Sequence, residues 1–230
     1  MTLTISRIGA AIAAAMAITL SGVSLAAYAS DKSDAEMLVA KAKTTVQAVA
    51  TDSDFASLRP ALANAKGVLI FPQVLKAGFV LGGSGGSGVL LTRDAATGAW
   101  TGPAFYTMGS ASIGFQAGAQ AAEMVMVVTS QKALDSLYTN KVNLGGDASV
   151  ALASRGAGRG ANITADFIVY SKVKGAFAGV SVDGSVLDVR QGLNGGYYGQ
   201  AATPLDILVK RGVSNSDAMA LQAAVADAAK

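Results

Sequence analysis

Hydrophobic residues recur at helical spacing near both ends of the chain and at strand spacing between them. Apolar positions three and four residues apart predict an amphipathic helix over residues 33–51, opened by the capping box Ser33-Asp34-Ala35-Glu36. A Thr203-Pro204 start and a Gly212 stop bound another expected helix. The full set of further expected helices covers about residues 55–65, 130–139, 203–211 and 216–229.

From Lys66 onward, short runs of Val, Ile, Phe and Tyr alternate with glycine, which is the composition of strands and tight turns. Strands are expected at residues 67–71, 88–91, 124–128 and 167–170. Asp94-Ala95-Ala96-Thr97-Gly98 before Trp100 predicts a hairpin turn. The pattern therefore predicts a single α+β domain, an antiparallel β sandwich or open barrel with N-terminal and C-terminal helices.

The first 29 residues have the pattern of a secretory signal peptide. Arg7 precedes the uncharged run of residues 8–25, and the small-residue triplet Ala27-Tyr28-Ala29 follows. We expect cleavage after Ala29, which leaves residues 30–230 as one exported domain. The alternative is an uncleaved membrane anchor, which the Ala-rich core and the cleavage site disfavour. The expected location is periplasmic, either free or peripheral on a membrane.

The composition excludes several kinds of chemistry. The 230 residues contain no cysteine and no histidine, so disulfides, thiolate nucleophiles and Ser-His-Asp triads are ruled out. Without Arg7 the chain has 17 basic and 15 acidic residues (18 − 1 against 15), a net charge of +2 that is too small to indicate nucleic-acid binding. We expect no enzyme activity, no cofactor and no bound metal.

Two short motifs match enzyme signatures without their required context. Residues 83–88 fit GxGxxG, but the following residues predict a strand instead of the helix that a dinucleotide site needs. We interpret these glycines as a bend that allows close backbone approach between strands, or as a flexible loop. Ser171 and Lys174 fit SxxK, yet the partner motifs of penicillin-recognising enzymes are missing and the local pattern is that of a strand.

Two segments of the chain, residues 68–79 and 167–177, are similar to each other. Each has an apolar run followed by Val, Lys, a pair of small residues and Phe, and one gap aligns them. The similarity predicts two related strand-turn-strand units. Chance similarity between glycine-rich strands is the alternative.

A cluster of cations lies between residues 151 and 182. Arg155, Arg159, Lys172 and Lys174 stand against one acid, Asp166. On a strand, Tyr170, Lys172 and Lys174 share one face, which suits a membrane boundary because lysine stems are apolar and their ammonium groups reach phosphate. The predicted lipid-binding residues are thus Arg155, Arg159, Tyr170, Lys172 and Lys174. An ordinary solvated face remains the alternative.

Several segments in this order resemble the SYLF domain family. They are 65–72, Gly78-Phe79 with the glycine-rich stretch to 90, 98–104, 112–118, 170–177, and Asn194 with Tyr197-Tyr198-Gly199. The resemblance spans roughly residues 36–212. It implies a lipid-binding domain, with phosphoinositide binding and links to actin in eukaryotic members and an exported stand-alone domain in bacteria. An exported protein would meet neither actin nor ordinary phosphoinositides, so the implied ligand is an anionic lipid.

The expected function is non-enzymatic binding of anionic phospholipid at the periplasmic side of a Gram-negative envelope. The alternative is a structural or protein-interaction module of the envelope with a protein partner and no specific lipid. A second surface competes for lipid contact, since the helix over residues 33–51 and its flank carry Lys32, Lys41 and Lys43.

Overall fold

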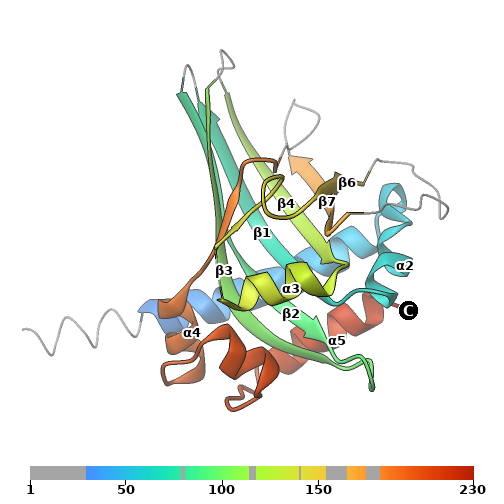
Figure 1. Cartoon of the computed structure of the whole chain (residues 1–230), viewed down its shortest axis with the longest axis vertical. Coiled ribbons are helices and arrows are strands. Elements are labelled where there is room, and N and C mark those ends of the chain that lie inside the picture. The colour runs from blue at the N-terminus through green and yellow to red at the C-terminus, as the bar shows by residue number, and fades with distance from the viewer. Residues whose placement is uncertain (1–29, 79–80, 114–117, 140, 154–164, 175–181) are drawn as a thin grey trace, which may run out of the picture.

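The computed structural model describes residues 30–78, 81–113, 118–139, 141–153, 165–174 and 182–230 (Figure 1). Its helices are a first helix over residues 30–50, η1 (Ser53–Phe55), α2 (Leu58–Ala63), α3 (Gln131–Thr139), α4 (Gln191–Tyr198), η2 (Leu205–Val209) and α5 (Ala218–Ala228). Its strands are β1 (Gly67–Gly78), β2 (Leu81–Arg93), β3 (Trp100–Ile113), β4 (Gly118–Val128), β5 (Val142–Asn143), β6 (Val150–Leu152), β7 (Phe167–Lys174) and β8 (Val186–Val189).

All eight strands form one curled sheet in the order β5-β8-β3-β2-β1-β4-β7-β6. Every pair of neighbours is antiparallel except β6 and β7. The α+β prediction is confirmed, and the sheet is an open half-barrel instead of a two-sheet sandwich. Figure 1 shows β1 to β4 extending well past the helices at one end.

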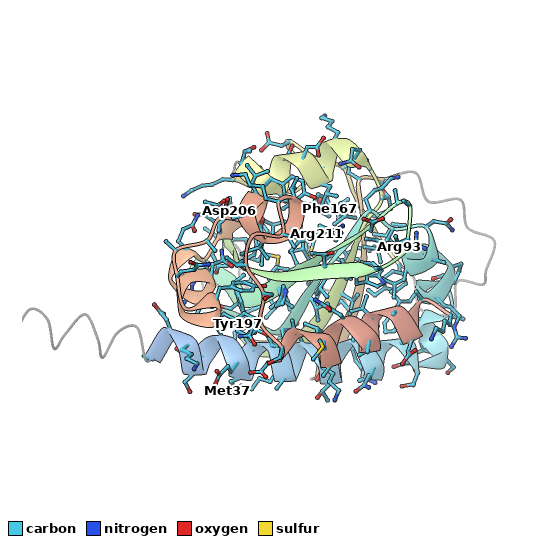
Figure 2. All side chains as sticks on the ribbon, turned by 90° about the horizontal axis from the view of Figure 1, so that it is seen from below. Met37, Arg93, Phe167, Tyr197, Asp206 and Arg211 are labelled. Carbon is cyan, nitrogen blue, oxygen red and sulfur yellow. The ribbon has the colours of Figure 1, made fainter. Side chains whose placement is uncertain are left out.

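Helices cover both faces of the sheet. The first helix and α5 lie against one face and α3 against the other (Figure 2). Val68 and Ile70 belong to the core under the first helix, whereas Leu69 and Phe71 belong to the core under α3. We call these the first-helix face and the α3 face. Because both faces are covered, this part of β1 is a continuous apolar run.

The first helix forms as the periodicity predicts. Its apolar positions are all at most 5% exposed and face the sheet: Ala35, Val39, Ala42, Val46 and Val49. The helix already includes residue 30, so the predicted start at Ser33 is wrong and the capping box lies inside it. None of the helices in the described ranges is long and apolar enough to cross a membrane.

The two similar segments form β1 and β7, the strands on either side of β4. Both are antiparallel to β4 and hence parallel to each other. The first segment continues into the β1–β2 hairpin, as expected. In the second segment, residues 175–181 lie outside the described residues, and the next described strand, β8, pairs with β3. The prediction of two related strand-turn-strand units therefore stays a prediction for the second unit.

The predicted turn and the helix after Thr203 are present. Asp94 Oδ1 accepts hydrogen bonds from the backbone N–H groups of Ala96 and Thr97 (2.9 Å each), and Gly98 has a φ of 73°. After η2, which is a π-helix, the left-handed conformation falls on Arg211 (φ 53°) and not on Gly212. The Arg211 guanidinium lies 2.6 Å from Asp94 Oδ2, which ties the end of η2 to the β2–β3 turn.

The helix α4 was not expected, because its sequence contains three glycines. The glycines have a packing role: a Cβ at Gly196 would lie 2.7 Å from the backbone nitrogen of Lys32, so only glycine lets α4 touch the start of the first helix. Asn194 is fully buried, and its Oδ1 accepts a hydrogen bond from the Phe105 N–H at 2.9 Å. Contacts with distant segments therefore outweigh a weak local helix propensity.

Candidate functional site

A cleft of about 320 Å³ lies between the first helix and the strands β1 and β4. Its walls contain both signs of charge and several hydrogen-bonding groups, from Lys41, Thr44, Thr45, Pro72, Gln73, Ala121, Ala122 and Glu123. The strand wall is irregular because β1 has one extra residue relative to β4 between Phe71 and Val74. Such bulges re-aim the side chains that follow them.

The two basic surfaces that compete in the sequence meet at this cleft. Lys41 lines it from the first helix, and Glu123 lines it from β4. Lys172 on β7 is paired in register with Glu123, so it stands directly beside the cleft. The first-helix lysine and the β7 lysine thus belong to one region of the molecule, which the sequence could not show.

Acids as well as lysines lie in this region. The Lys172 ammonium lies 3.0 Å from Asp52 Oδ2, and the two side chains are 39% and 20% exposed. Asp52 also accepts a hydrogen bond from the Asp54 N–H at 3.1 Å and thereby caps η1. Lys172 therefore has two acids beside it, Asp52 as its ion-pair partner and Glu123 as its partner in register. Neither acid lies near Lys172 in the sequence, and only an expected β4–β7 pairing would have indicated Glu123.

Tyr170 is not at the surface. It is 1% exposed and lies in the first-helix core, where its ring meets Phe55 edge-on with centroids 5.8 Å apart. Its hydroxyl lies 3.3 Å from Ser57 Oγ, and burial raises the pKa of the phenol. The expectation that Tyr170 sits at a headgroup boundary is therefore wrong, because the η1–α2 segment covers this part of β7.

The structure describes only some of the other predicted lipid-binding residues. Arg155 and Arg159 lie outside the described residues. Lys174 is the last described residue of β7 and is paired in register with Ala121. Lipid contact at these arginines and at Lys172 and Lys174 stays a prediction.

Asp166, the single acid of the basic segment, has a structural role. Its carboxylate accepts hydrogen bonds from Ser130 Oγ (2.5 Å) and from the N–H and Oγ of Ser149 (2.9 and 2.8 Å). The hydrogen bond from Ser130, followed by those from Ser149, holds the pKa of Asp166 below its usual value. Asp166 thereby fastens the start of α3 and the β6 segment to β7.

The two enzyme-like motifs are strand segments. Residues 83–88 lie within β2, which continues as a strand to Arg93, so no helix N-terminus follows the glycines. A Cβ at Gly86 would lie 2.3 Å from the Gln73 carbonyl oxygen, which confirms the interpretation as close approach between strands. Ser171 lies in β7 with its hydroxyl buried. Across the described ranges, no group of three acidic residues is placed to hold a metal.

The fold and the cleft define a single-sheet α+β half-barrel domain with a polar cleft under its first helix that contains both signs of charge. The chain belongs to the Ysc84 family, the SYLF domain family that the sequence resembles. The family model, described as "Las17-binding protein actin regulator", matches residues 109–228, just over half of the chain. The predicted family is thus confirmed.

Similar proteins are found in yeasts and mammals. LAS seventeen-binding protein 3 of Saccharomyces cerevisiae is 36% identical over 157 residues, which cover 65% of this chain and 34% of the yeast protein. An SH3 domain-containing protein of Schizosaccharomyces pombe is 38% identical over 144 residues (60% and 33%). SH3 domain-containing YSC84-like protein 1 of Bos taurus is 32% identical over 152 residues (64% and 44%). The chain thus spans a third to under half of these relatives. No solved structure matches it.

Proposed function

We propose that this chain is a non-enzymatic module that binds anionic phospholipid at a membrane surface. Membership of the SYLF family supports the proposal, since the family resemblance implies lipid binding. The proposal is carried by one observation: Lys41 of the first helix lines the cleft, and Lys172 of β7 stands beside it.

The first helix offers an apolar and a basic side chain side by side. Met37 is 47% exposed, and Figure 2 shows it on the side of the helix away from the sheet. Lys41 is exposed one turn further on, and residues four apart are neighbours on a helix surface. Together they suit shallow insertion of an apolar group beside a phosphate-binding ammonium.

The expected affinity is modest. Each cation near an anionic surface contributes about 1 kcal/mol, and this attraction is screened by salt. Asp52 and Glu123 offset part of it. The test is vesicle flotation: the protein should float with phosphatidylglycerol vesicles at low salt, lose binding as salt rises, and stay unbound with phosphatidylcholine alone.

Reversing Lys172 and Lys174 to glutamate should lower binding to anionic vesicles at least about tenfold at low salt. The substitution replaces two positive charges by two negative ones on one strand, so attraction becomes repulsion. Flotation measures the loss. The matched variant is Lys41→Glu/Lys43→Glu, which makes the same charge change on the first helix.

The thermal unfolding of both variants must be measured as well, because substitution of Lys172 also removes its ion pair with Asp52. The milder pair Lys172→Gln/Lys174→Gln removes the cations without adding acids beside Glu123. Wild-type flotation of the Lys172/Lys174 variants would exclude this strand as the contact surface. Wild-type flotation of all the variants would remove the electrostatic basis of the proposal.

The proposed location is the periplasmic side of a bacterial envelope, with residues 1–29 removed on export. The secretory pattern around Arg7 and Ala29 supports it. N-terminal sequencing of protein recovered from the periplasm should begin at Ser30. A mature protein that still begins at Met1 would contradict the proposed cleavage.

A second candidate function is a protein-interaction module. The matching family model is described as a Las17-binding actin regulator, and one yeast relative is named for binding Las17. Exposed apolar side chains at Met37, Val209 and Met219 would suit a partner. Cosedimentation with filamentous actin, alongside the flotation assay, separates the two functions: binding to actin with no flotation would favour this second candidate.

A further inference from the structure

A bulge in β1 reverses which face of the sheet each later side chain of the strand occupies. Phe71 and Val74 both belong to the core of the α3 face although they are an odd number of positions apart. The extra residue between them, at the Pro72–Gln73 bulge, is visible in the pairing with both neighbours, β2 and β4. Simple alternation from Phe71 would place Leu75 on the α3 face, and the bulge reverses this.

The reversal produces an arrangement that hydrophobic packing alone disfavours. Leu75 lies on the first-helix face and is 54% exposed. Lys76 lies on the α3 face, like Val74, and is half-buried. Lysine is rarely withdrawn from water without a partner, because burial costs hydration of the charge. Sites where a local rule is broken in this way are often functional.

No acid on the four long strands compensates Lys76. The strands β1 to β4 contain one acid, Glu123, which alternates with Val125 and so lies on the first-helix face. Among the described residues, no ion pair is found for Lys76. The Lys76 side chain is therefore half-buried, and in the described part of the chain neither an ion pair nor an acid on these four strands compensates its charge.

Polar neutral side chains stand on both sides of Lys76. Ser84 of β2 and Gln120 of β4 are its partners in register, so each lies one strand spacing away, about 5 Å. Ser84 Oγ is 2.7 Å from Ser110 Oγ on β3. Ser185 directly precedes Val186, the register partner of Gly109, and so extends the row beside Ser110.

Two members of this polar row have unused hydrogen-bonding capacity. Gln120 Oε1 and Ser185 Oγ are buried and have no hydrogen-bond partner among the residues that the structure describes, and Ser185 is 0% exposed. An orphaned buried polar atom costs about 1–3 kcal/mol. Gln120 is the register partner of Lys76, so a ligand that brings a negative charge to Lys76 and a hydroxyl group to Gln120 would satisfy both side chains, whereas Ser185 lies three strands away.

We propose that Lys76, flanked by Ser84 and Gln120, is a binding site for a phosphate ester that carries free hydroxyl groups. The phosphoryl group pairs with the Lys76 ammonium and the Ser84 hydroxyl, and a ligand hydroxyl donates to Gln120 Oε1. This inference rests on the proposed lipid function when the ester is a lipid headgroup. The site lies on the α3 face, opposite the cleft that contains Lys41 and Glu123.

The test uses soluble probes, so that headgroup recognition is separated from membrane adsorption. Monomeric dihexanoylphosphatidylglycerol, sn-glycerol 3-phosphate and inorganic phosphate are titrated into the full chain by calorimetry. We expect saturable binding of at least one of the two hydroxylated esters, and weaker binding of inorganic phosphate. Lys76→Gln should weaken ester binding at least about tenfold, whereas Lys230→Gln, which removes an exposed cation, should leave it unchanged.

The probes also identify the source of the ester. Equal affinity for glycerol phosphate and the short-chain lipid assigns a free ester, and tighter binding of the lipid assigns a headgroup; both support the site. Unchanged ester binding by Lys76→Gln, or no binding of either ester by the wild type, overturns it even if the protein floats with anionic vesicles. Ester binding through Lys76 without flotation keeps the site and rejects the membrane function.

A stability measurement separates a binding role from a structural one. If Lys76 is held half-buried for a ligand, Lys76→Met should melt at the same or a higher temperature than the wild type without ligand, because an unpaired charge is removed. A clear fall in the melting temperature would show that Lys76 stabilises the fold and would overturn the proposal.

Discussion

Replacing Tyr170 by alanine should lower the free energy of unfolding by about 3–5 kcal/mol, the range for truncating a buried aromatic side chain. Tyr170 is 1% exposed and packs edge-on against Phe55, so its removal leaves a cavity between β7 and the η1–α2 segment. Urea unfolding at neutral pH measures the change.

Tyr170→Phe is the matched control. It keeps the ring and removes only the hydroxyl, which lies 3.3 Å from Ser57 Oγ, so a loss of about 1 kcal/mol or less is expected. Tyr170→Phe should also float with anionic vesicles like the wild type. A Tyr170→Ala protein with wild-type stability and impaired flotation would contradict the buried position and restore Tyr170 as a lipid contact.

Gly86→Ala should destabilise the protein by roughly 2 kcal/mol or more, in the range of overpacking substitutions. A Cβ at this position would lie 2.3 Å from the Gln73 carbonyl oxygen and 3.2 Å from the Val74 Cα. Both atoms belong to the backbone of the β1 bulge, so relief requires the strand to move. Thermal and urea unfolding measure the cost.

Gly109→Ala provides the control for Gly86→Ala. A Cβ at Gly109 would approach nothing closer than the Ser84 carbonyl oxygen at 4.0 Å. Its stability should equal or slightly exceed that of the wild type, since alanine restricts the unfolded chain. Equal effects of the two substitutions would show that the bulge does not require glycine at position 86.

Local periodicity identified the elements that repeat one pattern over many residues. The burial of Val39, Val46 and Val49 follows from helical spacing, and Val68 to Phe71 form a strand as their composition predicts. The Asp94–Gly98 turn follows from residue chemistry that acts within five positions. The ordered motifs likewise placed the chain in its family.

The candidate sites depended on contacts that no local pattern contains. The sequence placed Tyr170 and Lys172 on one face of a strand, but not which segment covers that face. Asp52, the partner of Lys172, lies 120 positions away (172 − 52). Alternation from Phe71 would place both Leu75 and Lys76 on the wrong faces, because the Pro72–Gln73 bulge reverses them.

The sequence by itself therefore determined the helices with strong periodicity, the strand-rich centre and the family. The tertiary structure decided which faces are covered, which charges are balanced and which glycines are indispensable. The physical reason is range: hydrophobic periodicity and turn chemistry act between residues a few positions apart. Burial, ion pairing and close backbone approach depend on segments that meet only when the strands pair and the helices pack on the two faces of the sheet.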